Sequence, residues 1–246
     1  KQVGVSSNKL EEIGPAVQEL IEKQKLAGAV VLVARKGQII FTGSFGWADI
    51  ANDKSMQTET AFRIYSMTKP ITSIAVLILE ERNLLNLDDP VSQYIPAFKN
   101  LNVYAGSDGN DNFILEDMAR EITIRDLLRH TSGLTYDFLD TSPVGKMYEE
   151  QQVATSDNLE AMVDKLKNIP LTSQPGKKFT YGVSTDVLGF LVEKVSGMSF
   201  PDFLHQEIFV PLTMTETAFQ LPESAKSRFA KVYDSEGEQI VEAKDP

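Results

Sequence analysis

A serine and a lysine stand three positions apart, as Ser66 and Lys69, at the start of a long apolar run of the sequence. Residues three apart on a helix share a face, with Cβ atoms roughly 5–6 Å apart, so the Lys69 amine can reach the Ser66 hydroxyl. A serine hydroxyl is a weak nucleophile near neutral pH and needs an adjacent base to take its proton. At or near a helix N-terminus, Ser66 would also be favoured by free backbone N–H groups and the helix dipole. The pair therefore predicts a nucleophile with its base.

The Ser-x-x-Lys pattern also occurs at residues 6–9, so the surrounding sequence has to separate the two sites. Ser6 precedes a polar, amphipathic stretch, which is typical of a solvated helix start. Ser66 leads instead into residues 71–79, which are apolar nearly all round and predict a buried helix. In this window alone two interpretations of Lys69 stay open. It is either the base, or a lysine that extends to solvent or pairs with a carboxylate.

The composition is that of an ordinary globular protein. The 246 residues are 42% hydrophobic and 24% charged, enough for one large domain or two smaller ones. The most apolar segment, 71–79, is far shorter than the roughly 20 residues of a membrane span. A net charge of −11 argues against nucleic acid and anionic membranes as partners. The absence of cysteine excludes disulfides and thiolate chemistry. It leaves the compartment open, with a periplasmic or secreted location favoured.

The order of the elements predicts an α+β protein. Residues 8–25 have apolar positions at helical spacing, with Asn8 and Glu11 in a capping-box relation. Two strands joined by a tight turn follow at 29–34 and 38–42. Residues 104–112 and 136–156 are expected to be polar loops. Helices are expected at 122–129, 158–166, 187–195 and 200–210, the third closed by Gly197.

Other catalytic chemistry finds little support. The two histidines, His130 and His205, would have to supply any Ser-His-Asp triad, and no G-x-S-x-G motif is present. We interpret His130 as a structural loop residue, hydrogen-bonded to its turn, and His205 as a surface residue of an amphipathic helix. Neither belongs to a cluster with metal-ligand spacing, and there is no glycine-rich phosphate loop. We expect no metal, no nucleotide and no other cofactor.

Further segments, together with Ser66 and Lys69, resemble the β-lactamase-related serine hydrolases. That superfamily includes class C β-lactamases, DD-peptidases and esterases of the same fold. The resemblance covers nearly the whole chain. The matching segments are LDDPV at 87–91, IRDLLRHTSGL at 124–134, the Pro175-Gly176 turn leading to Tyr181, DVLG at 186–189 and IFVPL at 208–212.

The resemblance implies a β-lactamase/transpeptidase-like α+β fold, an antiparallel sheet flanked by helices plus a helical region. Residues 1–65 would begin the α/β region, 66–221 would form the helical region, and 222–246 would start the return to the sheet.

The same resemblance assigns roles to Ser66, Lys69 and Tyr181. Ser66 becomes the acyl-forming nucleophile, Lys69 its proton acceptor or electrostatic partner, and Tyr181 the tyrosine of the second motif. A neighbouring ammonium favours phenolate, so Tyr181 could pass the Ser66 proton to the leaving group. The alternative for Tyr181 is a half-buried aromatic with its hydroxyl hydrogen-bonded.

The chain departs from this family pattern at two places. The β-lactamases and DD-peptidases have Tyr-x-Asn, whereas here the triplet is Tyr181-Gly182-Val183, and valine offers no hydrogen bond to a substrate amide. The esterase-type relatives share the Tyr-x-x-x-x-Asp-Val-Leu-Gly run, which favours esters as substrates. The sequence also reaches Pro246 without a Lys-Thr-Gly motif, so we expect a separate or missing C-terminal segment to complete the oxyanion hole. Loss of one such donor costs on the order of 10²–10³ in rate.

We therefore expect a serine hydrolase that works through an acyl-enzyme and acts on a small-molecule ester or amide. A carboxylesterase on small or medium esters is favoured. The alternative enzymes are a β-lactamase, a DD-peptidase or an acyltransferase. From another class, the alternative is a catalytically silent binding or scaffold protein of the same fold.

Overall fold

The computed structural model describes residues 3–108, 112–237 and 239–243, and the chain divides into two compact units. Residues 1–64 and 220–246 form the first unit, and residues 65–219 form the second. Antiparallel strands dominate the first unit and helices dominate the second, so the α+β expectation is confirmed.

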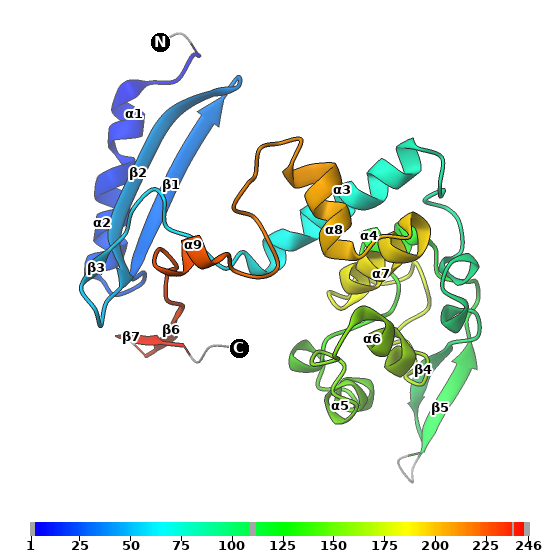
Figure 1. Ribbon diagram of the computed structural model, residues 1–246. Coiled ribbons are helices and arrows are strands. Elements are labelled where there is room, and N and C mark those ends of the chain that lie inside the picture. The colour runs from blue at the N-terminus through cyan, green and yellow to red at the C-terminus, as the bar shows by residue number, and fades with distance from the viewer. Residues whose placement is uncertain (1–2, 109–111, 238, 244–246) are drawn as a thin grey trace. The chain divides into compact units, whose positions relative to one another are not determined.

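An antiparallel hairpin is the centre of the first unit (Figure 1). It joins β1 (Gly28–Arg35) to β2 (Gln38–Asp49), and β3 (Lys54–Ser55) pairs with the end of β2. Lys36 and Gly37 form the two-residue turn with φ values of 52° and 72°. Turns with both central residues at positive φ match the twist of the strands they join. The predicted strands and turn are confirmed, and β2 extends beyond the expected end.

Two short helices precede the hairpin, and α2 contacts β2 (Figure 1). They are α1 (Ser7–Glu11) and α2 (Ile13–Glu22), so the helical segment expected over 8–25 is interrupted at Glu12 and ends at Glu22. The expected capping box of Asn8 with Glu11 is wrong. The helix begins at Ser7, and Asn8 therefore lies inside the first turn instead of at the cap.

The C-terminal part of the first unit contains α9 (Glu223–Lys226) and a second hairpin of β6 (Tyr233–Glu236) and β7 (Gln239–Glu242). The Ile50 backbone N–H donates to the Tyr233 hydroxyl at 2.7 Å, which connects this hairpin to the turn after β2. Within the described residues, β6 and β7 pair with each other and add no strand to the β1–β2–β3 sheet.

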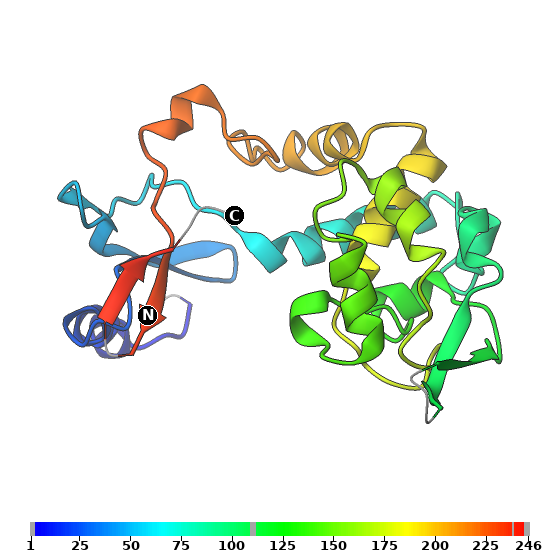
Figure 2. The ribbon, with the colours of Figure 1, turned by 90° about the horizontal axis from the view of Figure 1, so that it is seen from below.

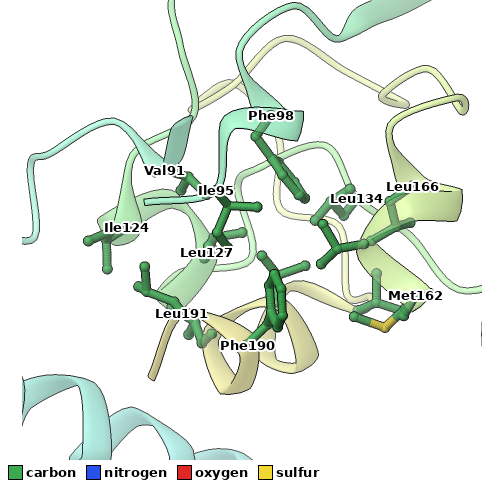
Figure 3. Packing of buried hydrophobic residues seen from close by; sticks show 14 of the residues in the cluster. Val91, Ile95, Phe98, Ile124, Leu127, Leu134, Met162, Leu166, Phe190 and Leu191 are labelled. Carbon is green, nitrogen blue, oxygen red and sulfur yellow. The ribbon is translucent and has the colours of Figure 1, made fainter. Parts of the chain in front are cut away.

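Helices around one apolar core make up the second unit. α3 (Thr68–Glu81) contacts α7 (Ser184–Ser196), and α7 also contacts α4, α6 and α8. Figure 3 shows side chains from these separate segments meeting in the core, among them Leu127, Leu166 and Phe190. The shorter helices are α4 (Ile124–Leu128), α5 (Pro143–Glu150), α6 (Leu159–Leu166) and α8 (Phe200–Leu204). Single turns of 3₁₀-helix lie at Tyr65–Met67, Val91–Gln93, Pro96–Phe98 and Asp137–Leu139, and a π-helical turn at His205–Phe209 continues α8.

Local caps fix where these helices begin and end. Thr123 and Asp126 form a reciprocal capping box on α4, and the Asn158 side chain accepts from the Ala161 backbone N–H on α6. Such caps stabilise a helix by about 1 kcal/mol each. Gly197 closes α7 in the left-handed region with φ of 72°, as predicted from the sequence. α7 begins at Ser184, three residues before the expected start, and this earlier start brings residue 186 into the helix.

Two stretches expected to be loops contain regular structure. β4 (Asn102–Ser107) and β5 (Phe113–Asp117) form a hairpin at one edge of the second unit (Figure 2), where an exposed hairpin needs no apolar alternation. The rings of Tyr104 and Phe113 pack edge to face with centroids 5.3 Å apart. Residues 109–111 of the expected loop lie outside the described residues. Within 136–156, α5 forms because Ser142 caps it and proline occupies its first position.

The burial of α3 also differs from expectation. Ala75, Val76 and Leu79 are fully buried, but Ile74 and Leu77 remain 47% and 44% exposed. The helix therefore has one buried face, although its apolar residues run nearly all round it. No helix in the described part of the chain combines the length and apolarity that crossing a membrane requires.

Candidate active site

Ser66, Lys69 and Tyr181 come together in the second unit. The Lys69 Nζ donates to Ser66 Oγ at 3.3 Å, and the Tyr181 hydroxyl donates to the same oxygen at 2.7 Å. The spacing of Ser66 and Lys69 placed them together in the sequence, whereas Tyr181 is 115 residues away from Ser66 along the chain. The serine oxygen thus lies between an amine and a phenol, each of which can hold or accept its proton.

Ser66 lies in the 3₁₀ turn of Tyr65–Met67, directly before α3. Tyr65 adopts a left-handed conformation with φ of 41°, which is costly for a residue with a side chain. This bend leads the chain into the helix and leaves Ser66 exposed close to the α3 N-terminus. The position expected for the nucleophile, at or near a helix N-terminus, is confirmed.

Two backbone hydrogen bonds hold the segment that carries Tyr181. The Thr180 N–H donates to the His130 carbonyl at 2.8 Å, and the Val183 N–H donates to the Thr135 carbonyl at 3.3 Å. Gly182 lies between them, where an added Cβ would stand 2.6 Å from the Thr135 Cα. Only glycine allows the two segments to approach so closely.

The Lys69 ammonium faces two aromatic rings. It lies 4.8 Å from the ring centroid of Tyr181 and 5.5 Å from that of Tyr136. The Tyr136 hydroxyl in turn donates to Asp186 Oδ2 at 3.3 Å. A cation over an aromatic face is stabilised by the ring quadrupole, so both tyrosines support a charged Lys69.

Sequence reasoning had assigned no role to Tyr136 or Asp186. The signals were present: Tyr136 follows the HTSGL segment closely, and Asp186 is the aspartate of the DVLG segment. Neither lies close to Ser66 in the sequence. Packing of α7 against α3 brings Asp186 to Lys69, and Tyr136 reaches it from the loop after α4.

The surroundings of Tyr181 and Asp186 shift the pKa values of these two groups. Hydrogen bonds with Lys69 and Ser66 lower the pKa of Tyr181, because they stabilise the phenolate. Burial raises the pKa of the Asp186 carboxyl, although the Lys69 charge and the Tyr136 hydroxyl partly offset that rise. Tyr181 is therefore the group that the site prepares for deprotonation.

His130 packs against the tyrosine. Its ring centroid lies 4.9 Å from that of Tyr181, and the residue has a left-handed backbone with φ of 54°. Burial, and then the Lys69 charge, lowers the pKa of the imidazole, which favours the neutral form. Its Nδ1 is buried without a hydrogen-bond partner among the described residues, so the side-chain bond expected to its turn is not made by this atom. His205 is exposed in the π-helical turn, as expected.

Val183, the residue that stands in place of the family asparagine, is buried in the core at 2% exposure. It presents no polar group to a substrate. One helical turn further on, Asp186 supplies a carboxyl that faces the Lys69 and Tyr136 pair. A carboxyl on α7 thus adds its charge to the surroundings of Lys69.

An ion pair supports the loop beneath the site. Arg120 donates through both terminal nitrogens to Asp126, and the Thr131 hydroxyl donates to the same carboxylate at 3.0 Å. Burial alone would raise the pKa of Asp126, but hydrogen bonds from Arg120 and Thr123 lower it to about 2. Gly176 passes so near that an added Cβ would lie 2.2 Å from Arg120 Nη2. This network connects the segments that lead to residues 130 and 181.

No group of three or more histidine, aspartate or glutamate side chains with metal-binding geometry occurs in residues 3–108, 112–237 and 239–243.

Comparison with known proteins identifies the family to which the chain is related. A family model described as Beta-lactamase matches residues 15–246 of the chain. The chain belongs to the β-lactamase family. The β-lactamase/transpeptidase-like fold inferred from the sequence is thus confirmed.

Within the β-lactamase family, the chain is similar to esterases and acyltransferases. It is 32% identical over 220 residues to "Esterase EstB" of Burkholderia gladioli, covering 87% of this chain and 52% of EstB. It is 31% identical over 212 residues to a monacolin J acid methylbutanoyltransferase of Aspergillus terreus, covering 84% of this chain and 51% of that protein. The chain spans about half the length of these curated relatives.

A solved structure with a similar fold also combines hydrolase and acyltransferase activity. EstCE1, described as a hydrolase with promiscuous acyltransferase activity, matches with a TM-score of 0.81 and 29% identity, over 97% of this chain and 60% of EstCE1. The relatives of this β-lactamase-family chain therefore include both serine hydrolases and acyltransferases.

Proposed function

We propose that this chain carries the catalytic serine, lysine and tyrosine of a carboxylesterase that works through an acyl-enzyme. The observation that carries the proposal is the contact of Ser66 Oγ with both the Tyr181 hydroxyl, at 2.7 Å, and Lys69 Nζ, at 3.3 Å. A nucleophile and a base at this distance match the requirement for covalent catalysis.

In the proposed mechanism, Tyr181 acts as the base. Its phenolate, stabilised by Lys69, takes the Ser66 proton as Oγ attacks the ester carbonyl carbon. The tetrahedral intermediate then collapses, the bond to the alcohol oxygen breaks, and Tyr181 returns the proton to the leaving alcohol. Water attacks the acyl-serine in the second half of the cycle. Tyr181 takes a proton from that water and gives it to Ser66 Oγ as the carboxylic acid departs.

The preference for esters rests on the position of Val183. A buried valine cannot hydrogen-bond a substrate amide, so a β-lactam or peptide loses one element of recognition. Nitrocefin turnover comparable to ester turnover would contradict this preference and favour the β-lactamase or DD-peptidase alternative.

Acyl transfer is the second candidate, because one relative is a methylbutanoyltransferase and EstCE1 has promiscuous acyltransferase activity. An alcohol can replace water in the second half of the same mechanism. Product analysis with an added alcohol distinguishes the two outcomes, since transfer yields a new ester and hydrolysis yields the acid.

The test of the proposed function uses the full-length protein, a fluorophosphonate and p-nitrophenyl acetate. We expect one covalent adduct on Ser66, detected by mass spectrometry, and a loss of ester turnover in Ser66→Ala on the order of 10⁴–10⁶-fold. Ser6→Ala is the matched control, because Ser6 also fits the Ser-x-x-Lys pattern but precedes α1 in the first unit. Absence of both adduct and turnover would leave the silent scaffold as the better explanation.

A further inference from the structure

A cavity of about 540 Å³ lies beside the candidate active site, entirely within the second unit. Residues of α3, α6, α7 and α8 line it, together with the loop that precedes α6. Small-molecule sites have volumes of roughly 300–1,000 Å³. Lys69 and Asp186 belong both to the lining of the cavity and to the group around Ser66, so the cavity borders that site.

Four apolar side chains form part of the cavity wall. Leu159, Met162, Phe200 and Phe219 contribute apolar side chains, and the last two pack with ring centroids 5.5 Å apart. These four residues come from α6, α8 and the segment that follows α8. The interior beyond Lys69 and Asp186 thus has the surface that an aliphatic group requires.

Three polar residues of the wall already have partners. The Thr72 hydroxyl donates to the Thr68 carbonyl at 3.1 Å, and the Ser156 hydroxyl donates to the Val153 carbonyl at 2.8 Å. The Glu193 carboxylate accepts from the Phe200 backbone N–H at 2.8 Å. Groups that are already hydrogen-bonded do not require a polar ligand, so a hydrocarbon can enter without leaving them unsatisfied.

The ester carbonyl carries two substituents, the acyl group and the alcohol, and the proposed mechanism indicates which of them enters the cavity. The leaving alcohol takes its proton from Tyr181 in the proposed mechanism and therefore lies on the tyrosine side. The cavity is lined by Lys69 and Asp186, while Tyr181 is not among the residues that line it. The substituent directed toward the cavity is then the acyl group.

We propose that this cavity, called the acyl pocket, binds a medium-length aliphatic acyl chain of the ester. The inference rests on the proposed function and adds the substrate class to it. An alkyl chain of roughly six to ten carbons fills about a third to just over half of the volume, taking about 30 Å³ for each water-sized group. Burial of each methylene raises kcat/KM about three- to fourfold, until the chain reaches the end of the pocket.

The experiment compares p-nitrophenyl acetate with p-nitrophenyl octanoate on the full-length protein and three variants. Leu159→Trp adds bulk at the start of α6, where the native side chain is only half-buried. Phe219→Ala opens the wall, since Phe219 is 54% exposed and its removal disturbs little packing. Leu84→Trp is the matched control, because this exposed leucine follows α3 and does not line the acyl pocket.

We expect wild type to prefer octanoate over acetate at least about tenfold in kcat/KM, and Leu159→Trp to remove most of that preference. Phe219→Ala should move the optimum toward longer chains, and Leu84→Trp should change neither substrate. An octanoate-to-acetate ratio that stays at the wild-type value in both pocket variants overturns the proposal. So does a Leu159→Trp effect on octyl acetate and not on the octanoate ester, which would place the alcohol in the pocket.

The result separates this inference from the proposed function. If Ser66 forms the fluorophosphonate adduct and acetate is hydrolysed, but the chain-length ratio is unaffected, only the acyl pocket fails. If neither adduct nor acetate turnover is seen, the proposed function fails as well. Adduct formation in Leu159→Trp also shows that this variant has folded around an intact site.

Discussion

The Tyr181 hydroxyl lies 2.7 Å from Ser66 Oγ, across 115 residues of sequence. A hydrogen bond of this length lets the proton move between the two oxygens without rearrangement of the backbone. Lys69 Nζ donates to the same serine oxygen and lies 4.8 Å from the ring centroid of Tyr181. The same cation is therefore placed to stabilise the Tyr181 phenolate. The predictions that follow test each of these relationships.

Removal of the phenol should slow acylation without unfolding the site. In Tyr181→Phe we expect the rate of p-nitrophenyl ester hydrolysis to fall about 10²–10⁴-fold, the range for loss of a general base. Tyr104→Phe is the matched control, since it removes a hydroxyl that shares a hydrogen bond with Ser107 on the β4–β5 hairpin, apart from the Ser66 group. Equal losses in both variants, or none in Tyr181→Phe, would exclude the tyrosine as the base.

The pH dependence should report the lowered pKa of Tyr181. Because the phenolate is the reactive form, labelling of Ser66 should rise with pH through the pKa of Tyr181, which lies below its ordinary value near 10. In Lys69→Gln the largest stabilising interaction is lost, so the midpoint should move to higher pH and the rate at neutral pH should fall. A midpoint unchanged by Lys69→Gln would assign the titration to another group, of which neutral His130 is the nearest.

The carboxyl of Asp186 should act in the opposite direction on the same titration. Its negative charge raises the pKa of Tyr181, so Asp186→Asn should move the midpoint of Ser66 labelling to lower pH. Asp157→Asn is the control, because that aspartate is exposed in the loop before α6. A role limited to packing would instead leave the midpoint in place while the rate at every pH falls by the same factor.

The ion pair beneath the site should contribute to stability in a pH-dependent way. Arg120→Ala leaves the buried Asp126 carboxylate without its main partner, which we expect to cost roughly 2–3 kcal/mol in the free energy of unfolding near pH 7. The pKa of Asp126 is lowered to about 2, so this contribution is full above pH 4 and is lost as the pH falls toward 2. The difference between wild type and variant should therefore shrink in acid.

A neighbouring exposed pair provides the comparison for this stability measurement. Arg125 and Asp88 form an ion pair whose side chains are 44% and 69% exposed. Such pairs contribute about 0–1 kcal/mol, so Arg125→Ala should change the urea midpoint little. If Arg125→Ala destabilises the protein as much as Arg120→Ala, burial is not the reason for the effect.

Local features of the fold could be predicted because nearby residues decide them. The β1–β2 turn needs only Lys36 and Gly37 at positive φ, and the end of α7 needs only Gly197. The β4–β5 hairpin could not be predicted in this way, because a cross-strand contact between Tyr104 and Phe113 holds it. The signals for α5 are local, a Ser142 cap and a proline at its first position, but they lie within a stretch that otherwise suggests a loop.

The sequence by itself determined the Ser66 and Lys69 pair, since two residues that are three positions apart on a helical turn cannot lie far from each other. It also contained the motif resemblance that identified Tyr181 as a candidate. Only the tertiary structure decided that Tyr181 meets Ser66, that Asp186 and Tyr136 face Lys69, and that a cavity opens beside them. These relationships depend on how α7 packs against α3 and on the close approach at Gly182, and such contacts between distant segments arise from packing of the whole unit.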